Sequence, residues 1–86
     1  MSRHEIASPD STNPLEVVVG WDPPLGTFFA QVWDRSLDED DPDAELLWIG
    51  CTPGEITDPR QVLNAVGAWV TVPPDLVHTL NAEAHA

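Results

Sequence analysis

Residues 15–33 read LEVVVGWDPPLGTFFAQVW. Two runs rich in β-branched and aromatic residues, 15–21 and 27–33, flank a short segment that holds two prolines and Gly26. Such runs are typical of strands. Proline lacks the backbone N–H that a sheet ladder needs, and glycine tolerates a positive φ, so the segment between the runs is predicted to be a turn. Residues 15–33 therefore predict a β-hairpin with a five-residue connection.

A third apolar run, residues 45–51, predicts a third strand. Pro53 and Gly54, which follow it, fit the two central positions of a type II turn. Further on, Asp58 can cap a helix whose first residue is Pro59, and Gln61 can complete a capping box. Apolar residues at helical spacing then mark one face of this helix: Val62, Leu63, Val66 and Trp69.

A second helix is predicted to open at Pro73 and Pro74, and residues 81–86 are predicted to fray. Its apolar side holds Leu76, Val77 and Leu80. The predicted fold class is α+β: a three-stranded antiparallel meander sheet backed by two short C-terminal helices, in the order β-β-β-α-α. Residues 1–14 offer almost nothing to bury and are predicted to be a disordered arm. Residues 15–86 form the single small domain that 86 residues allow.

Acidic residues dominate the charge of the chain. Fifteen Asp and Glu stand against three arginines and no lysine, which gives a formal net charge of -12. This charge repels phosphate backbones and anionic membrane surfaces, so we expect neither direct nucleic-acid binding nor membrane binding. Five of the acidic residues form one run, here named the acidic loop, which is predicted to be extended and mobile: Asp38, Glu39, Asp40, Asp41 and Asp43. A partner chosen by charge would be basic; the alternative is that the acidity only keeps the chain soluble.

Both faces of the predicted sheet carry large apolar side chains. Alternation along the first strand separates Val17 and Val19 from Val18, and along the second it separates Phe28 from Phe29, while the pairing between strands stays open. Two short helices can cover one such face. The other would hold candidate interaction residues, which are Phe29, Trp33, Leu46 and Trp48. This face could bind a second copy of the chain or another protein. Alternatively, it could be covered within the chain, by helices placed one on each face or by the N-terminal arm.

The residue patterns of catalysis and metal binding are missing. The only cysteine, Cys51, excludes an internal disulfide framework and is predicted to be a buried, inert thiol. No C-x-x-C pair, helical His pair, complete calcium-loop pattern or Gly-rich phosphate loop occurs. We therefore predict no catalytic, cofactor or metal site. An enzyme would need Cys51 with His78, or a carboxylate pair such as Asp22 with Asp34.

No apolar N-terminal run resembles a signal peptide and no run is long enough for a membrane helix, which favours a cytoplasmic protein. The stretch VVGWDPPLGTFFAQVWD, residues 18–34, is similar to short acidic bacterial proteins that carry no assigned function. With residues 47–50 and 53–56, the resemblance covers roughly residues 17–74. It implies a bacterial, cytoplasmic setting, and no activity or cofactor.

Three hypotheses about function follow. The first is a non-enzymatic protein that dimerises or holds a protein partner through an aromatic sheet face, with the acidic loop selecting the partner by charge. The second is an acidic inhibitor or DNA mimic that occupies a basic surface of a nucleic-acid-binding protein. The third is a small enzyme dependent on a thiol or on a carboxylate pair.

Overall fold

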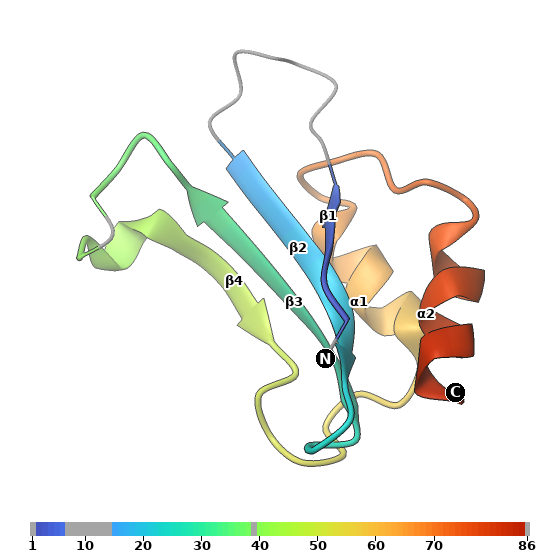
Figure 1. Ribbon diagram of the computed structural model, residues 1–86. Helices are drawn as coiled ribbons and strands as arrows, with labels where there is room; N and C mark the ends of the chain where they lie inside the picture. The colour runs from blue at the N-terminus through green and yellow to red at the C-terminus, as the bar shows by residue number, and fades with distance from the viewer. Residues whose placement is uncertain (1, 7–14, 39, 86) are drawn as a thin grey trace.

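A computed structural model describes residues 2–6, 15–38 and 40–85 of the chain. They form a four-stranded antiparallel sheet, in the order β1-β2-β3-β4, and two helices that follow it in sequence and pack on it (Figure 1). The elements are β1 (His4–Ile6), β2 (Leu15–Asp22), β3 (Thr27–Asp34), the 3-10 turn η1 (Pro42–Ala44), β4 (Glu45–Ile49), α1 (Pro59–Val66) and α2 (Leu76–Ala84). The α+β class, the antiparallel meander and the two C-terminal helices are confirmed.

The predicted hairpin is formed by β2 and β3. Their register runs from Asp22 opposite Thr27, beside the turn, to Leu15 opposite Asp34 at the far end. Residues 23–26 connect the strands, and Gly26 has a φ of 62° and donates its N–H to the carbonyl of Asp22 at 2.8 Å. The proline and glycine residues therefore make the turn for the reasons given above.

The sheet has one strand more than the three predicted, because β1 lies in the segment predicted to be a disordered arm. Ile6 pairs with Val17 and is only 6% exposed. Ser2 donates its N–H to the carbonyl of Trp21, and Trp21 donates its N–H to the hydroxyl of Ser2. A short edge strand needs little apolar surface of its own when a neighbour supplies the hydrogen-bond ladder. The prediction of a disordered arm is wrong for residues 4–6, and residues 7–14 lie outside the described residues.

The helix signals are confirmed in part. Asp58 caps α1 by accepting the N–H of Arg60 at 3.0 Å, and Pro59 is the first helical residue. The second helix begins later than predicted, at Leu76, and continues to Ala84, into the segment predicted to fray. Its last turn is tied to β1, because Nε2 of His4 lies 2.8 Å from Oε1 of Glu83. Among the described residues, no helix has the length and apolar character needed to cross a membrane.

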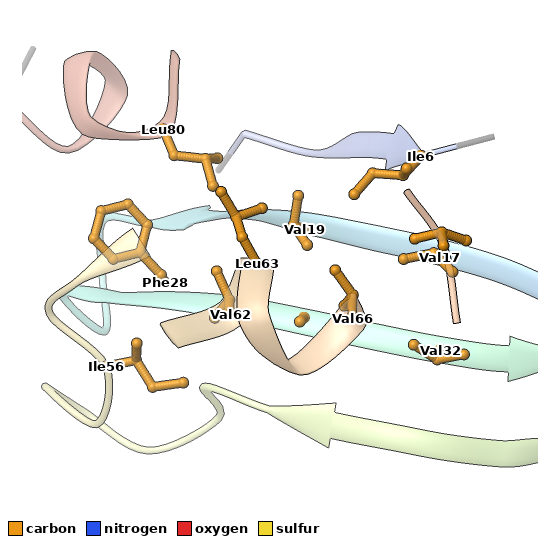
Figure 2. Packing of buried hydrophobic residues seen from close by; sticks show 12 residues of the cluster. Ile6, Val17, Val19, Phe28, Val32, Ile56, Val62, Leu63, Val66 and Leu80 are labelled. Atoms are coloured by element: carbon orange, nitrogen blue, oxygen red, sulfur yellow. The ribbon is translucent and has the colours of Figure 1, made fainter. Parts of the chain in front are cut away.

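Both helices cover the same face of the sheet, so the alternative of one helix on each face is wrong (Figure 1). Figure 2 shows the valines of β2 and β3 facing those of α1, with Leu80 of α2 and Ile6 of β1 beside them. Most of the buried cluster is aliphatic. Its sheet members are Ile6, Val17, Val19, Phe28, Ala30 and Val32, and its helix members are Val62, Leu63, Val66 and Leu80.

The fourth strand is shorter than the predicted run 45–51, because Gly50 ends it. Gly50 has a φ of 82°, and a Cβ at this position would lie 2.0 Å from the carbonyl oxygen of Phe28. The backbone leaves the sheet there, and Cys51 is exposed rather than buried. The Pro53-Gly54 turn is confirmed: Gly54 has a φ of 65°, and Glu55 donates its N–H to the carbonyl of Thr52 at 3.1 Å.

Candidate interaction surface

The sheet face opposite the helices, here named the open face, is fixed by the strand registers. Cross-strand partners share a face, and the pairs Glu16–Trp33, Val18–Gln31, Gly20–Phe29 and Gln31–Trp48 all lie on this one. Leu46 lies beside them at a β-bulge, because the register shifts between Val32 and Trp33. All four apolar residues predicted to form the surface are therefore placed on or beside the open face.

Phe29 packs on the sheet and is buried, so it is not an exposed residue of this face. Its side chain is only 6% exposed, and its ring lies over Gly20. A Cβ on Gly20 would lie 2.7 Å from Cζ of Phe29 and 2.2 Å from the carbonyl oxygen of Ser2. The aromatic ring thus covers a backbone that glycine leaves bare, as in other sheets where an aromatic packs on a cross-strand glycine.

Exposed apolar surface is concentrated on the β4 side of the face. Trp48 is 52% exposed and Leu46 is 40% exposed, while Trp33 is half-buried. The Trp33 indole N–H donates to Oε1 of Gln31, which also stands opposite Trp48. Both helices pack on the other side of the sheet and do not cover these side chains.

The β1–β2 side of the face is polar, and sequence reasoning missed its organisation. Glu16 contacts two arginines: Arg3 Nη2 lies 3.7 Å from Oε1, and the Arg35 side chain bonds Oε2. Val18, which follows Glu16 by two residues and so shares its face, is fully buried. Only the hairpin register, which places Glu16 one pair away from the end of β3, could have indicated that residue 35 lies near residue 16.

A cavity of about 390 Å³ opens on this face beside Trp48. Phe29 and Gln31 also line it, and Asp22, Arg3 and the exposed Cys51 add polar groups. A hollow of this size, with an aromatic wall and few polar groups, can receive one side chain of a partner.

The acidic loop leads directly into β4. Asp41 caps η1 by accepting the N–H of Asp43 at 2.9 Å, and the Asp41 N–H bonds the carbonyl of Asp38 at 2.9 Å. The loop is therefore partly folded, not extended as predicted, because an aspartate cap and Pro42 favour a helical turn. The ion pairs of Arg3, His4 and Arg60 are made with carboxylates outside the loop, which are Glu16, Glu83 and Asp58. Glu39 lies outside the described residues.

Several carboxylates outside the acidic loop accept hydrogen bonds from nearby backbone and side-chain groups. Glu55 accepts the N–H of Gly50 at 2.9 Å and that of Thr52 at 3.3 Å, and the bond from Gly50 is the main reason that its pKa is lowered. The hydroxyl of Ser36 lowers the pKa of Asp34 in the same way. The Asp58–Arg60 side-chain pair lowers the pKa of Asp58 and raises that of Arg60. Glu55 thus fixes the chain just after β4.

The residue pairs considered for an enzyme are not brought together. Cys51 lines the cavity on the open face, whereas His78 lines a hollow between the two helices on the other side of the sheet. Asp22 and Asp34 stand at opposite ends of the hairpin, seven residues or about 23 Å apart along the strands. Within the described ranges, no three His, Cys, Asp or Glu side chains converge as a metal ion would require.

Comparisons of this chain with protein-family models, with curated proteins and with solved structures found no match.

Proposed function

We propose that this chain is a non-enzymatic interaction protein that binds a basic partner protein through the β4 side of its open face. One observation carries the proposal: both helices pack on the same side of the sheet, which leaves Trp48 52% exposed on the other side. The acidic loop at the start of β4 adds negative charge to the same region. Trp33, Leu46 and Trp48 supply the apolar contact, and the loop attracts the partner.

The apolar contribution is large enough to matter. A tryptophan side chain buries about 200 Å² when fully covered, so the exposed half of Trp48 offers about 100 Å². Burial of this area stabilises a complex by about 2.5 kcal/mol at 25 cal/mol per Å². An exposed tryptophan with a cavity beside it is typical of an interface hot spot.

A basic partner fits this surface better than a second copy of the chain. A stable dimer usually buries about 800 Å² on each subunit, which would be about 15% of the 5191 Å² exposed here. Trp48 and Leu46 supply only a small part of that area. Each copy also carries a formal charge of -12, so self-association brings like charges together, whereas a basic partner relieves them.

The test is affinity capture on the immobilised chain, at about 0.05 M and about 0.5 M salt. Proteins retained by the wild type should be basic, should be lost with Trp48→Ala, and should be retained by Leu37→Ala, which removes another exposed apolar side chain. Asp40→Asn with Asp43→Asn should weaken capture at low salt more than Asp75→Asn, which removes an exposed charge on the helix side. If Trp48→Ala retains the same proteins as the wild type, and the salt concentration makes no difference, the proposal is contradicted.

The same experiment separates the inhibitor hypothesis from this one. If the retained protein binds nucleic acid and duplex DNA displaces it, the chain occupies a nucleic-acid-binding surface. If DNA has no effect, the partner is held elsewhere. Concentration-dependent sedimentation of the chain alone, with loss of association in Trp48→Ala, would instead show a homodimer.

A further inference from the structure

We infer that the partner is held as a fifth strand along β4, through an extended segment in which arginine or lysine alternates with apolar residues. This inference rests on the proposed function and specifies how the binding takes place. It follows from the outer edge of β4, which pairs with no further strand in the described part of the chain, from the side chains on its two faces and from the charge at its N-terminal end.

The two edges of the sheet differ in how they are protected. The β1 edge has only three residues. Two exposed charged residues lie on or beside it, Arg3 and Glu5. The β4 edge has five residues, Glu45–Ile49, of which only Glu45 is charged. Proteins usually protect an edge strand with lysine, proline or a bulge, because its unpaired N–H and C=O groups can pair with another chain. Here only the bulge at Leu46 and the charge of Glu45 serve this purpose, and the rest of the strand is apolar.

An added strand would gain contacts on both faces of the sheet. Its side chains alternate, so one set would stand beside Trp48 on the open face and the other beside Leu47 and Ile49. Leu47 and Ile49 are half-buried against the core and stand at its margin. A cation over the exposed indole of Trp48 gains a cation–π contact, whereas apolar side chains extend the core beside Leu47 and Ile49. The expected pattern is therefore a cationic residue at every second position.

Charge selects the occupant. Glu45 is the first residue of β4, and the acidic loop precedes it. Residues 38–45 hold six carboxylates and no basic residue, so they attract a cationic segment placed alongside. A second copy of β4 would bring its own Glu45 and acidic loop, and the like charges would oppose pairing.

The test uses a synthetic peptide of alternating arginine and valine and the ¹⁵N-labelled chain. We expect amide shifts and slowed hydrogen exchange at residues 45–49, together with a shift of the Trp48 indole N–H. A peptide with glutamate in place of arginine should not bind. Trp48→Ala should weaken binding by at least about tenfold, because it removes both the apolar and the cation–π contact.

Backbone methylation of the peptide tests strand pairing without any change to the protein. In a strand, the N–H groups of alternate residues point to opposite edges. Methylation of one alternate set, either the arginine or the valine nitrogens, should therefore weaken binding at least about tenfold, and methylation of the other set should have little effect.

Three results overturn the inference, and all three are distinguishable from failure of the proposed function. If both methylated peptides bind as tightly as the parent, charge and Trp48 hold the peptide without strand pairing, and the proposed function stands. If the parent peptide leaves residues 45–49 unperturbed, β4 is not the binding edge. Protected β4 amides in the chain alone, lost on dilution, would assign the edge to a second copy. Failure of the proposed function is measured separately, by capture that does not depend on Trp48.

Discussion

Thr27 offers a direct test of how the sheet is joined to the segment that leads into α1. It is the only buried polar residue among those described and is fully buried. Its Oγ1 accepts the N–H of Ile56 at 2.9 Å and can donate to the carbonyl of Phe28 at 2.9 Å or to that of Ile56 at 3.2 Å. Phe28 in turn donates its N–H to the carbonyl of Ile56 at 2.9 Å. Thr27, the first residue of β3, is thereby hydrogen-bonded to the segment around Ile56, which leads into α1.

Thr27→Val removes the hydroxyl and nearly preserves the shape of the side chain. The Ile56 N–H is then buried without an acceptor, which costs about 1–3 kcal/mol. Little cavity forms, so this polar cost should be most of the effect. For a domain of this size each kcal/mol lowers Tm by about 4–8 °C, so a loss of about 2 kcal/mol predicts a fall of roughly 8–16 °C.

Urea and thermal unfolding of purified variants, followed by circular dichroism, measure this effect. Thr27→Ser keeps the hydroxyl and should retain most of the polar contribution, losing only that of one methyl group. Thr79→Val removes an exposed hydroxyl that bonds the Asp75 carbonyl at 3.3 Å, so it controls for the chemistry of the substitution. A loss below about 0.5 kcal/mol in Thr27→Val would refute the argument that Ile56 depends on this hydroxyl.

Three further outcomes are expected. Gly20→Ala should destabilise the fold by about 1–3 kcal/mol and shift the Phe29 ring resonances, because the new methyl meets the ring and the Ser2 carbonyl; unchanged resonances would contradict this packing. Because the pKa of Glu55 is lowered from its ordinary value of 4.5, the stabilisation by its carboxylate is present above pH 4.5 and is lost as pH falls through the folded-state pKa. The stabilities of the wild type and of Glu55→Gln should therefore differ at pH 7 and become equal in acid. A pH-independent difference would argue against it. Cys51 should react with a thiol reagent about as fast in the folded chain as in urea, and strong protection would contradict its exposure.

Local sequence signals identified most of the fold. The hairpin, the Asp58 cap and the Pro53-Gly54 turn depend on residues close together in the chain, where proline, glycine and aspartate restrict the backbone directly. The strand β1 was missed because Ser2-Arg3-His4-Glu5-Ile6 has a single large apolar residue and no strand signal of its own. Its partners, Val17, Val18 and Val19, are far away in sequence, so only the folded sheet shows the pairing.

The candidate surface was predictable in outline and not in detail. Alternation along the second strand placed Phe29 and Trp33 on one face, but it could not fix the pairing that brings Trp48 to the same face or show which of the three stays exposed. That depends on the register, which sets Phe29 over Gly20 and Trp48 over Gln31 at the edge. Cys51 was expected inside because it follows an apolar run. The positive φ of Gly50 turns the chain away first, and a φ sign cannot be read from hydrophobic periodicity.

Solubility alone does not explain where the charges lie. An acidic chain stays soluble with its carboxylates spread over the surface, and spreading them lowers their mutual repulsion. Here Arg3 and Arg35 both contact Glu16 on β2, while the acidic loop concentrates its carboxylates in the few residues before β4. The most exposed tryptophan among the described residues, Trp48, lies on that same strand, where it works against solubility. Water and salt screen the charges of the acidic loop but leave the Trp48 indole exposed, whereas a cationic, partly apolar segment along β4 would both oppose the charge and bury the indole.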